Sequence, residues 1–189
     1  VLRAQILAWK NHFAGQLGRT REVEAALQQC LDLLKLADDS AEARSVKAFA
    51  LLELGRLKLL IGEREKAKQD YERSLAGYRE IGDQWSVANV LSALGLLAWN
   101  LARYAEAEQR YRESLAIRQT IGNRRGIAEV LVGLGNIYTF SGQSEEAKPL
   151  NEESLAIYRE MNDQIGIAQN FGYVASTFFF NGDFPRAIE

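Results

Sequence analysis

The chain has 189 residues, 47% of them hydrophobic and 25% charged, which is enough apolar material for a globular core. A formal net charge of -2 shows no basic excess, so nucleic acid and anionic membrane surfaces are both disfavoured as partners. The sequence has one cysteine, no signal peptide and no apolar run near the length of a transmembrane helix, which together predict a cytoplasmic protein without membrane contact.

Helices are expected along the whole chain, because only two prolines occur in 189 residues and Ala, Leu, Glu and Arg are abundant. The first segment, 1–39, is predicted to be a divergent helix pair, since Gly18 and Cys30 align with Gly62 and Ser74 at an offset of 44 residues. Later segments repeat at an offset of 40, and the four extra residues amount to about one helical turn.

The boundary after this first segment carries Asp39 and Glu42, whose spacing resembles a capping box. Because the extra turn must be accommodated here, we expect the helix that starts near Ser40 to begin one turn earlier than its counterparts in the later repeats.

From residue 40 the chain repeats without gaps every 40 residues, in segments 40–83, 84–123 and 124–163. Segment 164–189 begins a further repeat and stops inside it, so we expect one array, 1–189, cut from a longer protein. The residues that recur at matching positions are Gly55, Gly95 and Gly135; Ala67, Ala107, Ala147 and Ala187; and Ser74, Ser114 and Ser154.

Each period contains two helical patterns separated by glycine. Glycine can adopt the left-handed conformation that ends a helix, and an aspartate or asparagine directly after it can cap the next helix. The glycines expected inside repeats are Gly62, Gly142 and Gly182, those between repeats are Gly82 and Gly122, and the capping residues are Asp83, Asn123 and Asp163.

Glycine also recurs in the interior of the first helix, where it costs about 1 kcal/mol relative to alanine. Its repetition at Gly55, Gly95 and Gly135 predicts a close approach of the paired helix, with the recurring serine of the second helix facing it.

The second helix of segment 124–163 has a local departure from the pattern. Pro149 lies about five residues into it, where proline removes a backbone hydrogen bond. Two residues later, Asn151 replaces the tyrosine of the preceding repeats. We expect this helix to start late or to kink near Glu145.

The arrangement of Leu-Gly in the first helix, Gly at its end, and Ala, Tyr and Ser-Leu along the second helix resembles the tetratricopeptide repeat. The 40-residue period, with Ile81-Gly82-Asp83 between repeats, is similar to the longer-helix subclass of kinesin light chains and to helical arms of bacterial signalling ATPases and transcription regulators. The resemblance implies an all-α fold, a right-handed superhelical solenoid of antiparallel helix pairs whose first helices line a concave, partner-binding face.

A catalytic site is not expected. One histidine and one cysteine exclude most His- and Cys-based metal and nucleophile schemes, and Cys30 occupies the packed position of the recurring serine. No glycine-rich phosphate loop is present, and the acidic residues scatter over solvated helix faces. The sequence therefore predicts neither an enzyme nor a bound metal or cofactor.

Two short clusters admit more than one interpretation. Arg124-Arg125 is more simply an exposed helix start than a nucleic-acid contact. Three consecutive phenylalanines, Phe178 to Phe180, cannot all face one way on a helix, so at least one points into a groove or is covered by a following helix.

The candidate binding positions lie one step round the first helices from the core stripe. Core positions such as Leu51, Leu91 and Leu131 are identical between repeats, whereas these positions change in charge and size. A bound partner would require such variation, although free drift at exposed positions also explains it. The candidates are Phe49, Arg56, Asn89, Ser92, Trp99, Glu129, Val132, Asn136, Thr139, Gln169 and Ser176.

The sequence thus predicts a non-catalytic scaffold that binds a protein or an extended peptide on its concave face. The asparagine and glutamine side chains suit peptide backbone, and Trp99 offers an apolar plate. An alternative is a regulatory arm of a larger signalling ATPase or transcription regulator that binds a small effector or its own catalytic domains. End-to-end self-association is a third possibility, because neither end has the polar outer face of a capping repeat.

Overall fold

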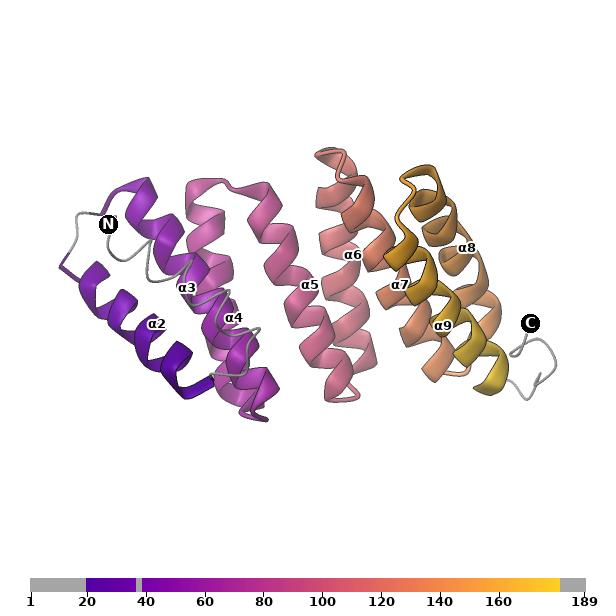
Figure 1. Cartoon of the computed structure of the whole chain (residues 1–189), viewed down its shortest axis with the longest axis horizontal. Coiled ribbons are helices and arrows are strands. Elements are labelled where there is room, and N and C mark those ends of the chain that lie inside the picture. The colour runs from indigo at the N-terminus through magenta and orange to yellow at the C-terminus, as the bar shows by residue number, and fades with distance from the viewer. Residues whose placement is uncertain (1–19, 37–38, 181–189) are drawn as a thin grey trace. The chain divides into compact units, whose positions relative to one another are not determined.

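The computed structural model describes residues 20–36 and 39–180, which form helices joined by short turns, with no strand among them (Figure 1). The helices are α2 (Thr20–Leu34), α3 (Ala41–Leu60), α4 (Arg64–Ile81), α5 (Gln84–Asn100), α6 (Tyr104–Thr120), α7 (Arg124–Phe140), α8 (Ser144–Glu160) and α9 (Gln164–Phe180).

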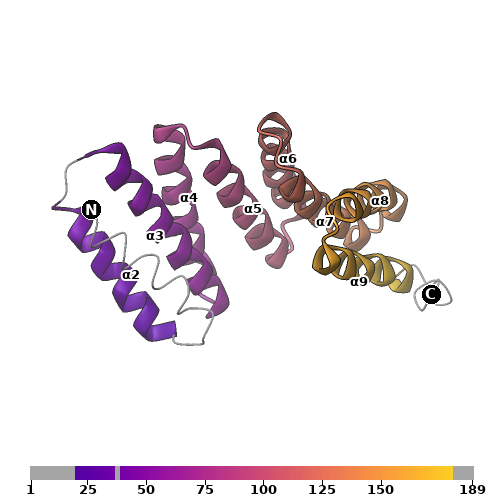
Figure 2. The same cartoon turned by 45° about the horizontal axis from the view of Figure 1, so that its top comes forward.

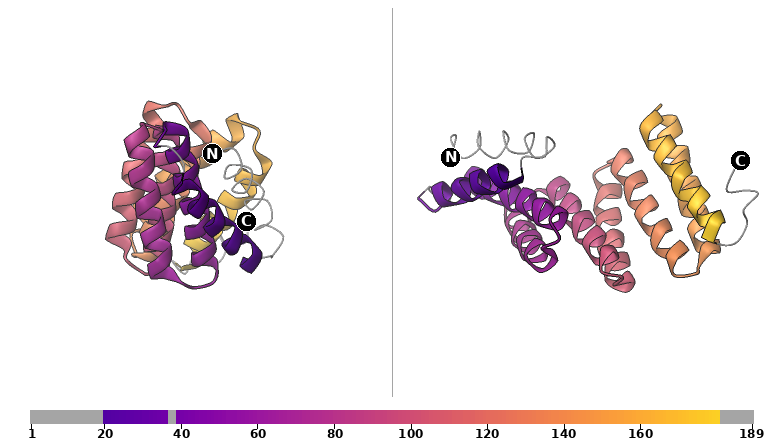
Figure 3. Two further views of the ribbon diagram at one scale, coloured as in Figure 1. Left: turned by 90° about the vertical axis from the view of Figure 1, so that its left-hand side faces the viewer. Right: turned by 60° about the horizontal axis from the view of Figure 1, so that its bottom comes forward.

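The chain divides into two compact units, each built from neighbouring helices that run antiparallel. In the first unit, 1–97, α3 packs against α2 and α4 (Figures 1 and 2). In the second unit, 98–189, α7 packs against α6, α8 and α9, and α9 runs beside both α7 and α8 (Figure 3). The all-α fold of sequential antiparallel helix pairs is therefore confirmed.

Every turn between helices from α3 to α9 has the same backbone design. The residue after the turn donates its N–H to a carbonyl five residues earlier, as in Asn123 to Arg118 at 2.9 Å, the arrangement of a Schellman motif. The residue before the donor is left-handed at Gly62, Gly82, Gly122 and Gly142, as predicted, and also at Ala102 and Asn162. The predicted turn at Gly182 lies outside the described residues.

The capping residues between repeats are also confirmed. A carboxylate or amide oxygen accepts a 3.0 Å hydrogen bond from the backbone N–H three residues later at Asp83, Asn123 and Asp163. Ahead of α3 the cap is Ser40, whose hydroxyl accepts from Ala43 N at 3.2 Å, so the expected box built on Asp39 is wrong.

The early start of α3 is confirmed as well. This helix has 20 residues, whereas α5, α7 and α9 have 17 each, and the extra turn lies at its N-terminal end. Most of the four-residue difference in the sequence offset is therefore taken up by the three additional residues of α3.

The glycines inside first helices do mark close helix contacts, but the predicted partner is wrong. A Cβ atom on Gly55 would lie 2.5 Å from the buried ring of Tyr71, and one on Gly135 would lie 2.4 Å from Asn151 Oδ1. The tyrosine position, and not the serine position, therefore faces these glycines.

The recurring serine has a different role, which is to hydrogen-bond the paired helix. Ser74 Oγ donates to Ala48 O at 2.7 Å, and Ser154 Oγ donates to Ala128 O at 3.0 Å. Both hydroxyls are fully buried. A small side chain is required here because the hydroxyl must reach a helical carbonyl directly.

The expected late start of α8 is wrong. The helix begins at Ser144 and continues unbroken through Pro149 to Glu160. Pro149 is exposed, so its ring faces solvent and only the hydrogen bond to the carbonyl of Glu145 is lost.

The core of the first unit surrounds Cys30, which is fully buried among apolar residues of α2 and α3 such as Leu27, Val46 and Leu54. Burial raises the pKa of its thiol to about 11. Cys30 is therefore a small packed residue, as its place in the repeat predicts, and it is poorly suited to act as a nucleophile.

Candidate partner-binding site

The second unit presents a line of solvent-facing side chains along the inner helices α7 and α9, which pack against each other. On α7 the line consists of the exposed Arg125, Glu129 and Phe140 and the half-buried Asn136, at steps of four or seven residues. We call these residues, together with Trp99 on the last turn of α5 and Gln169 on α9, the inner-helix surface.

Two predicted members of this surface are buried instead. Val132 is 8% exposed and packs in the core with Leu131 and Ile157. Thr139 is 6% exposed, and its hydroxyl donates to Gly135 O at 2.9 Å within its own helix. The helix turns by about 100° per residue, so a stripe placed slightly too close to the core takes in buried residues such as Thr139, which directly precedes the exposed Phe140.

The remaining candidates are placed unit by unit. In the first unit Arg56 is exposed on α3 and forms an ion pair with Glu53 at 2.9 Å, whereas Phe49 is half-buried. Asn89 and Ser92 are half-buried on α5. The side chain of Ser176 lies outside the described residues, as do Phe178 to Phe180 and His12.

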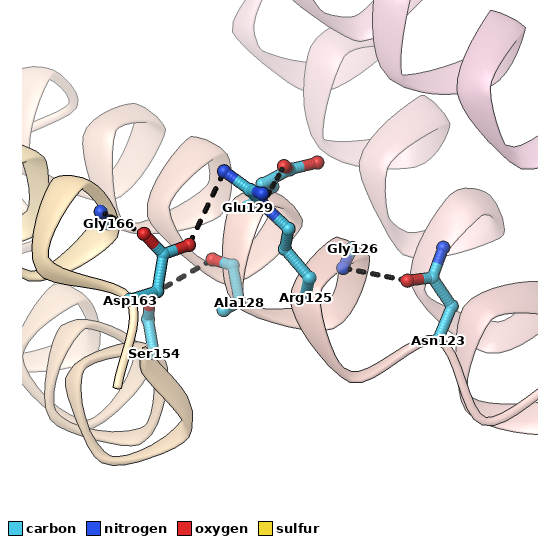
Figure 4. A network of polar contacts seen from close by, with 8 residues as sticks. All are labelled: Asn123, Arg125, Gly126, Ala128, Glu129, Ser154, Asp163 and Gly166. Atoms are coloured by element: carbon cyan, nitrogen blue, oxygen red, sulfur yellow. Dashed lines mark hydrogen bonds and ion pairs between the residues drawn. The ribbon is translucent and has the colours of Figure 1, made fainter. Parts of the chain in front are cut away.

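Arg125 is not among the residues predicted for this surface, but it is the centre of its charge network (Figure 4). Its guanidinium lies 3.4 Å from Glu129 Oε1 on the same helix and 3.3 Å from Asp163 Oδ2, the cap of α9. Glu129 is therefore charge-compensated by its neighbour. Asp163 both caps α9 and connects it to α7, so the two inner helices are joined at their N-terminal ends.

An aromatic pair occupies the other end of α7. The rings of Trp99 and Phe140 meet edge to face with centroids 5.7 Å apart, and Phe140 is 46% exposed. The indole N–H of Trp99 is buried and has no acceptor among the described residues. This end of the surface therefore offers apolar area, mainly from the exposed Phe140 ring.

A buried cation lies beneath the N-terminal turn of α7, and sequence reasoning missed it. Arg118 is 3% exposed, at the position of the buried tyrosines Tyr78 and Tyr158. Its guanidinium fills the space that a Cβ on Gly126 would take, and its Nε donates to Ser114 Oγ at 3.1 Å. Burial lowers the pKa of Arg118, and the charge of Glu129 opposes that shift.

A second polar cluster in the same unit joins α6 to α7. Tyr138 Oη donates to Glu108 Oε1 at 2.7 Å, and Arg112 donates to both groups. The hydrogen bonds from Tyr138 and Arg112 lower the pKa of the Glu108 carboxyl. Because the hydrogen bonds of Tyr138 with Glu108 and Arg112 join a side chain of α7 to side chains of α6, the cluster contributes to the packing of α6 on α7.

The described part of the chain contains neither a candidate metal site nor a helix suited to span a membrane. Within 20–36 and 39–180, no group of three or more His, Cys, Asp or Glu side chains is placed to hold a metal ion. None of α2 to α9 is long and apolar enough to cross a membrane.

The fold and its solvent-facing inner helices define the class of α-helical repeat proteins that stack antiparallel helix pairs. Residues 86–160 match the tetratricopeptide repeat family, so this part of the chain is similar to tetratricopeptide repeats. That repeat is a module without catalytic activity of its own. No curated protein sequence matches the chain significantly.

Solved structures support the same fold. A kinesin light chain of Podospora anserina with nearly identical tetratricopeptide-like repeats has a TM-score of 0.77 and 18% identity, over 98% of this chain and 90% of that one. The Rap conjugation gene regulator of plasmid pLS20, in complex with the Phr* peptide, has a TM-score of 0.74 and 16% identity, over 93% of this chain and 45% of the regulator.

A signal transduction ATPase of Pyrococcus horikoshii with a tetratricopeptide repeat sensor is also similar. Its TM-score is 0.76 and its identity is 19%, over 96% of this chain and 28% of the ATPase. At these identities the likeness establishes the fold alone, and the chain spans less than half of the regulator and of the ATPase.

Proposed function

We propose that this domain is a non-catalytic module that binds an extended peptide segment of another protein along the inner-helix surface. The observation that supports the proposal best is the chemistry of that surface in the second unit. Asn136 and Gln169 present amides, which can both donate to and accept from a peptide backbone. Trp99 and Phe140 lie at one end as an aromatic anchor.

Differences between repeats support the same proposal. The core positions repeat, but the position of Asn136 is Arg56 in the first unit's α3 and Leu96 in α5. If this surface served only to keep the protein soluble, the aromatic pair Trp99 and Phe140 at its end would not be needed. Burial of an aromatic side chain provides much of the energy at a typical binding hot spot.

Electrostatics narrow the kind of peptide. Arg125 is shared between Glu129 and Asp163, so these three groups keep a single negative charge at the N-terminal end of the surface, which is too little to select a strongly charged ligand. We therefore propose a largely neutral peptide with one apolar side chain that contacts Trp99 and Phe140. The peptide complex of the structurally similar Rap regulator provides a precedent for this fold.

The experiment compares two double variants of matched chemistry. Asn136→Ala/Gln169→Ala removes two amides from inner helices, and Gln109→Ala/Gln119→Ala removes two exposed amides from the outer helix α6. The full chain and both variants would be used to capture partners from a lysate, and then titrated with peptides derived from the captured protein. Affinity should fall at least tenfold for the first variant only. Equal affinity of all three proteins would refute the proposal.

A second candidate is a regulatory arm of a larger signalling protein, and the similarity to the sensor of the Pyrococcus ATPase favours it. In that case the same surface would contact the protein's own domains or a small effector. Sequencing the gene on both sides of this segment tests it, because a nucleotide-binding or DNA-binding domain in the same reading frame is required.

End-to-end self-association is the third candidate. The expected result is a concentration-dependent dimer of this chain by light scattering that is lost when further repeats are added at its ends. A monomer over the whole accessible concentration range would rule it out.

A further inference from the structure

A pocket of about 270 Å³ opens in the first unit between α3 and α4. Its floor is apolar and consists of Ala48, Leu51, Ala76 and Gly77. Its rim carries Arg44, Lys47, Arg73, Asp39 and Glu80. Nothing in the repeat architecture requires such a space.

Comparison with the second unit shows how the pocket arises. At the position of Gly77, α8 has Ile157, which is 7% exposed and packs with Ala128 and Leu131. Those two residues correspond to Ala48 and Leu51 on the pocket floor. The pocket therefore opens beside the position that a branched aliphatic side chain fills in another copy of the same repeat.

The rim has also changed, from apolar to cationic. Lys47 stands where α5 has the buried Val87 and α7 has Ile127, which packs against the core. Arg73 stands where the other repeats have Glu113 and Glu153. This one repeat has thus lost an aliphatic side chain and gained two positive charges at the same site.

The two rim acids do not cancel these charges completely. Asp39 is held by Arg44, whose guanidinium lies 3.3 Å from Asp39 Oδ1 and donates to Asp39 O at 3.0 Å. Arg73 also lies 3.6 Å from Asp70, a carboxylate that Lys58 binds as well, so Lys47, Arg73 and Lys58 against Asp70 and Glu80 leave an excess of one positive charge around the pocket. A ligand with a single negative charge beside an apolar body complements this arrangement.

We propose that this pocket binds a small monocarboxylate with a branched aliphatic body. The aliphatic group packs beside the position that Ile157 fills in the other unit, and the carboxylate pairs with the ammonium of Lys47 or the guanidinium of Arg73. This site is independent of the peptide-binding surface.

The probe is N-acetyl-isoleucine, which combines a carboxylate with a branched aliphatic side chain, and its control is the uncharged N-acetyl-isoleucine amide. Both would be titrated into isotope-labelled full chain and followed by amide resonance shifts. The acid should give saturable shifts at pocket residues at or below about 10 mM, the range expected for so small a ligand. The amide should bind at least tenfold more weakly, and binding of the acid should weaken with added salt.

Matched variants locate the site. Gly77→Ile fills the pocket with the residue of the second unit, and should abolish the shifts. Its Cβ would lie 3.2 Å from Ala48 Cβ, so a second variant, Lys47→Gln, covers the possibility of misfolding. Lys47→Gln should lower the affinity for the acid at least fivefold, whereas Lys66→Gln on the exposed face of α4 should not change it.

The variant Glu80→Gln tests whether the bound ligand is negatively charged. It removes the remaining rim acid and should tighten binding of the acid. No saturable shift with wild-type protein, equal binding of the acid and the amide, unchanged binding to Lys47→Gln, or weaker binding to Glu80→Gln would each overturn the proposal. A short peptide ending in isoleucine that binds more tightly than the free acid would support it and identify a chain terminus as the source of the carboxylate.

Discussion

The turn between α5 and α6 gives a direct test of the backbone design, because Ala102 adopts a left-handed conformation with φ of 55°. The equivalent residues in the neighbouring repeats are Gly62 and Gly142, with φ of 83° and 76°. A Cβ added to either glycine meets nothing within 4 Å. Substitution at this turn therefore changes backbone strain alone, without a steric contribution from the surroundings.

We predict that Ala102→Gly stabilises the fold. An L-residue with a Cβ pays roughly 1–2 kcal/mol in the left-handed region, and relief of this strain is partly offset by the greater entropy of glycine in the unfolded chain, roughly 0.4–1 kcal/mol. The net gain is about 0.5–1 kcal/mol. For a chain of this size, about 1 kcal/mol corresponds to roughly 2–4 °C in Tm.

The control is the same substitution in a right-handed helix. Ala116 is exposed in the middle of α6, where glycine costs about 1 kcal/mol, so Ala116→Gly should lower the stability. Thermal and urea unfolding of both variants would be followed by circular dichroism. A loss of stability on Ala102→Gly, or shifts of the same sign in the two variants, would refute the argument.

Three further predictions concern buried positions. Gly55→Ala should destabilise by about 1–2 kcal/mol in urea unfolding despite its better helix propensity, because the new Cβ would lie 2.5 Å from the buried Tyr71 ring; an unchanged midpoint would contradict this packing. Asn170→Val should stabilise by about 1 kcal/mol in the same assay, because the buried Oδ1 of Asn170 has no partner among the described residues, and its desolvation outweighs the one 3.2 Å hydrogen bond from Nδ2 to Asn151 O that is lost; Val130 occupies that position one repeat earlier. Cys30 should react with a thiol reagent at pH 8 far more slowly in the native protein than in denaturant, because burial raises its pKa to about 11 and depletes the thiolate; rapid native-state labelling would show that α2 opens readily.

Most of the fold was predictable from the sequence because its determinants are local and repeated. The turn glycines and the caps Asp83, Asn123 and Asp163 each act within a few residues of their own position, so the sequence identifies them without tertiary information. The extra turn of α3 was likewise visible as a change of offset.

The errors concern which side chain meets which across two helices. Gly55 faces Tyr71 and not the recurring serine, and the serine hydroxyl instead reaches Ala48 O. A rotation of the helix by a fraction of a turn decides such contacts, and periodicity does not fix that rotation. The same uncertainty put the buried Val132 and Thr139 on the candidate surface and omitted Phe140.

Arg118 and the pocket at Gly77 show another limit. Each is a departure at one position of one repeat, and its effect depends on space that the partner helix leaves free. Periodicity identifies the position of a substitution, but only the packing shows whether the replacement buries a charge or opens a cavity.

The serine hydroxyl that reaches across each helix pair has a consequence for how such repeats tolerate insertion and deletion. The bond from Ser74 to Ala48 and the bond from Ser154 to Ala128 join residues separated by the same 26 positions. The serine hydroxyl can reach only one carbonyl of the paired helix, so the bond requires a fixed number of residues between the serine and that carbonyl. An added or lost residue in the turn at Gly62 must shift one helix along its axis or break this bond, whereas the turns between repeats lie outside this span. Length variation should therefore accumulate between repeats rather than within them.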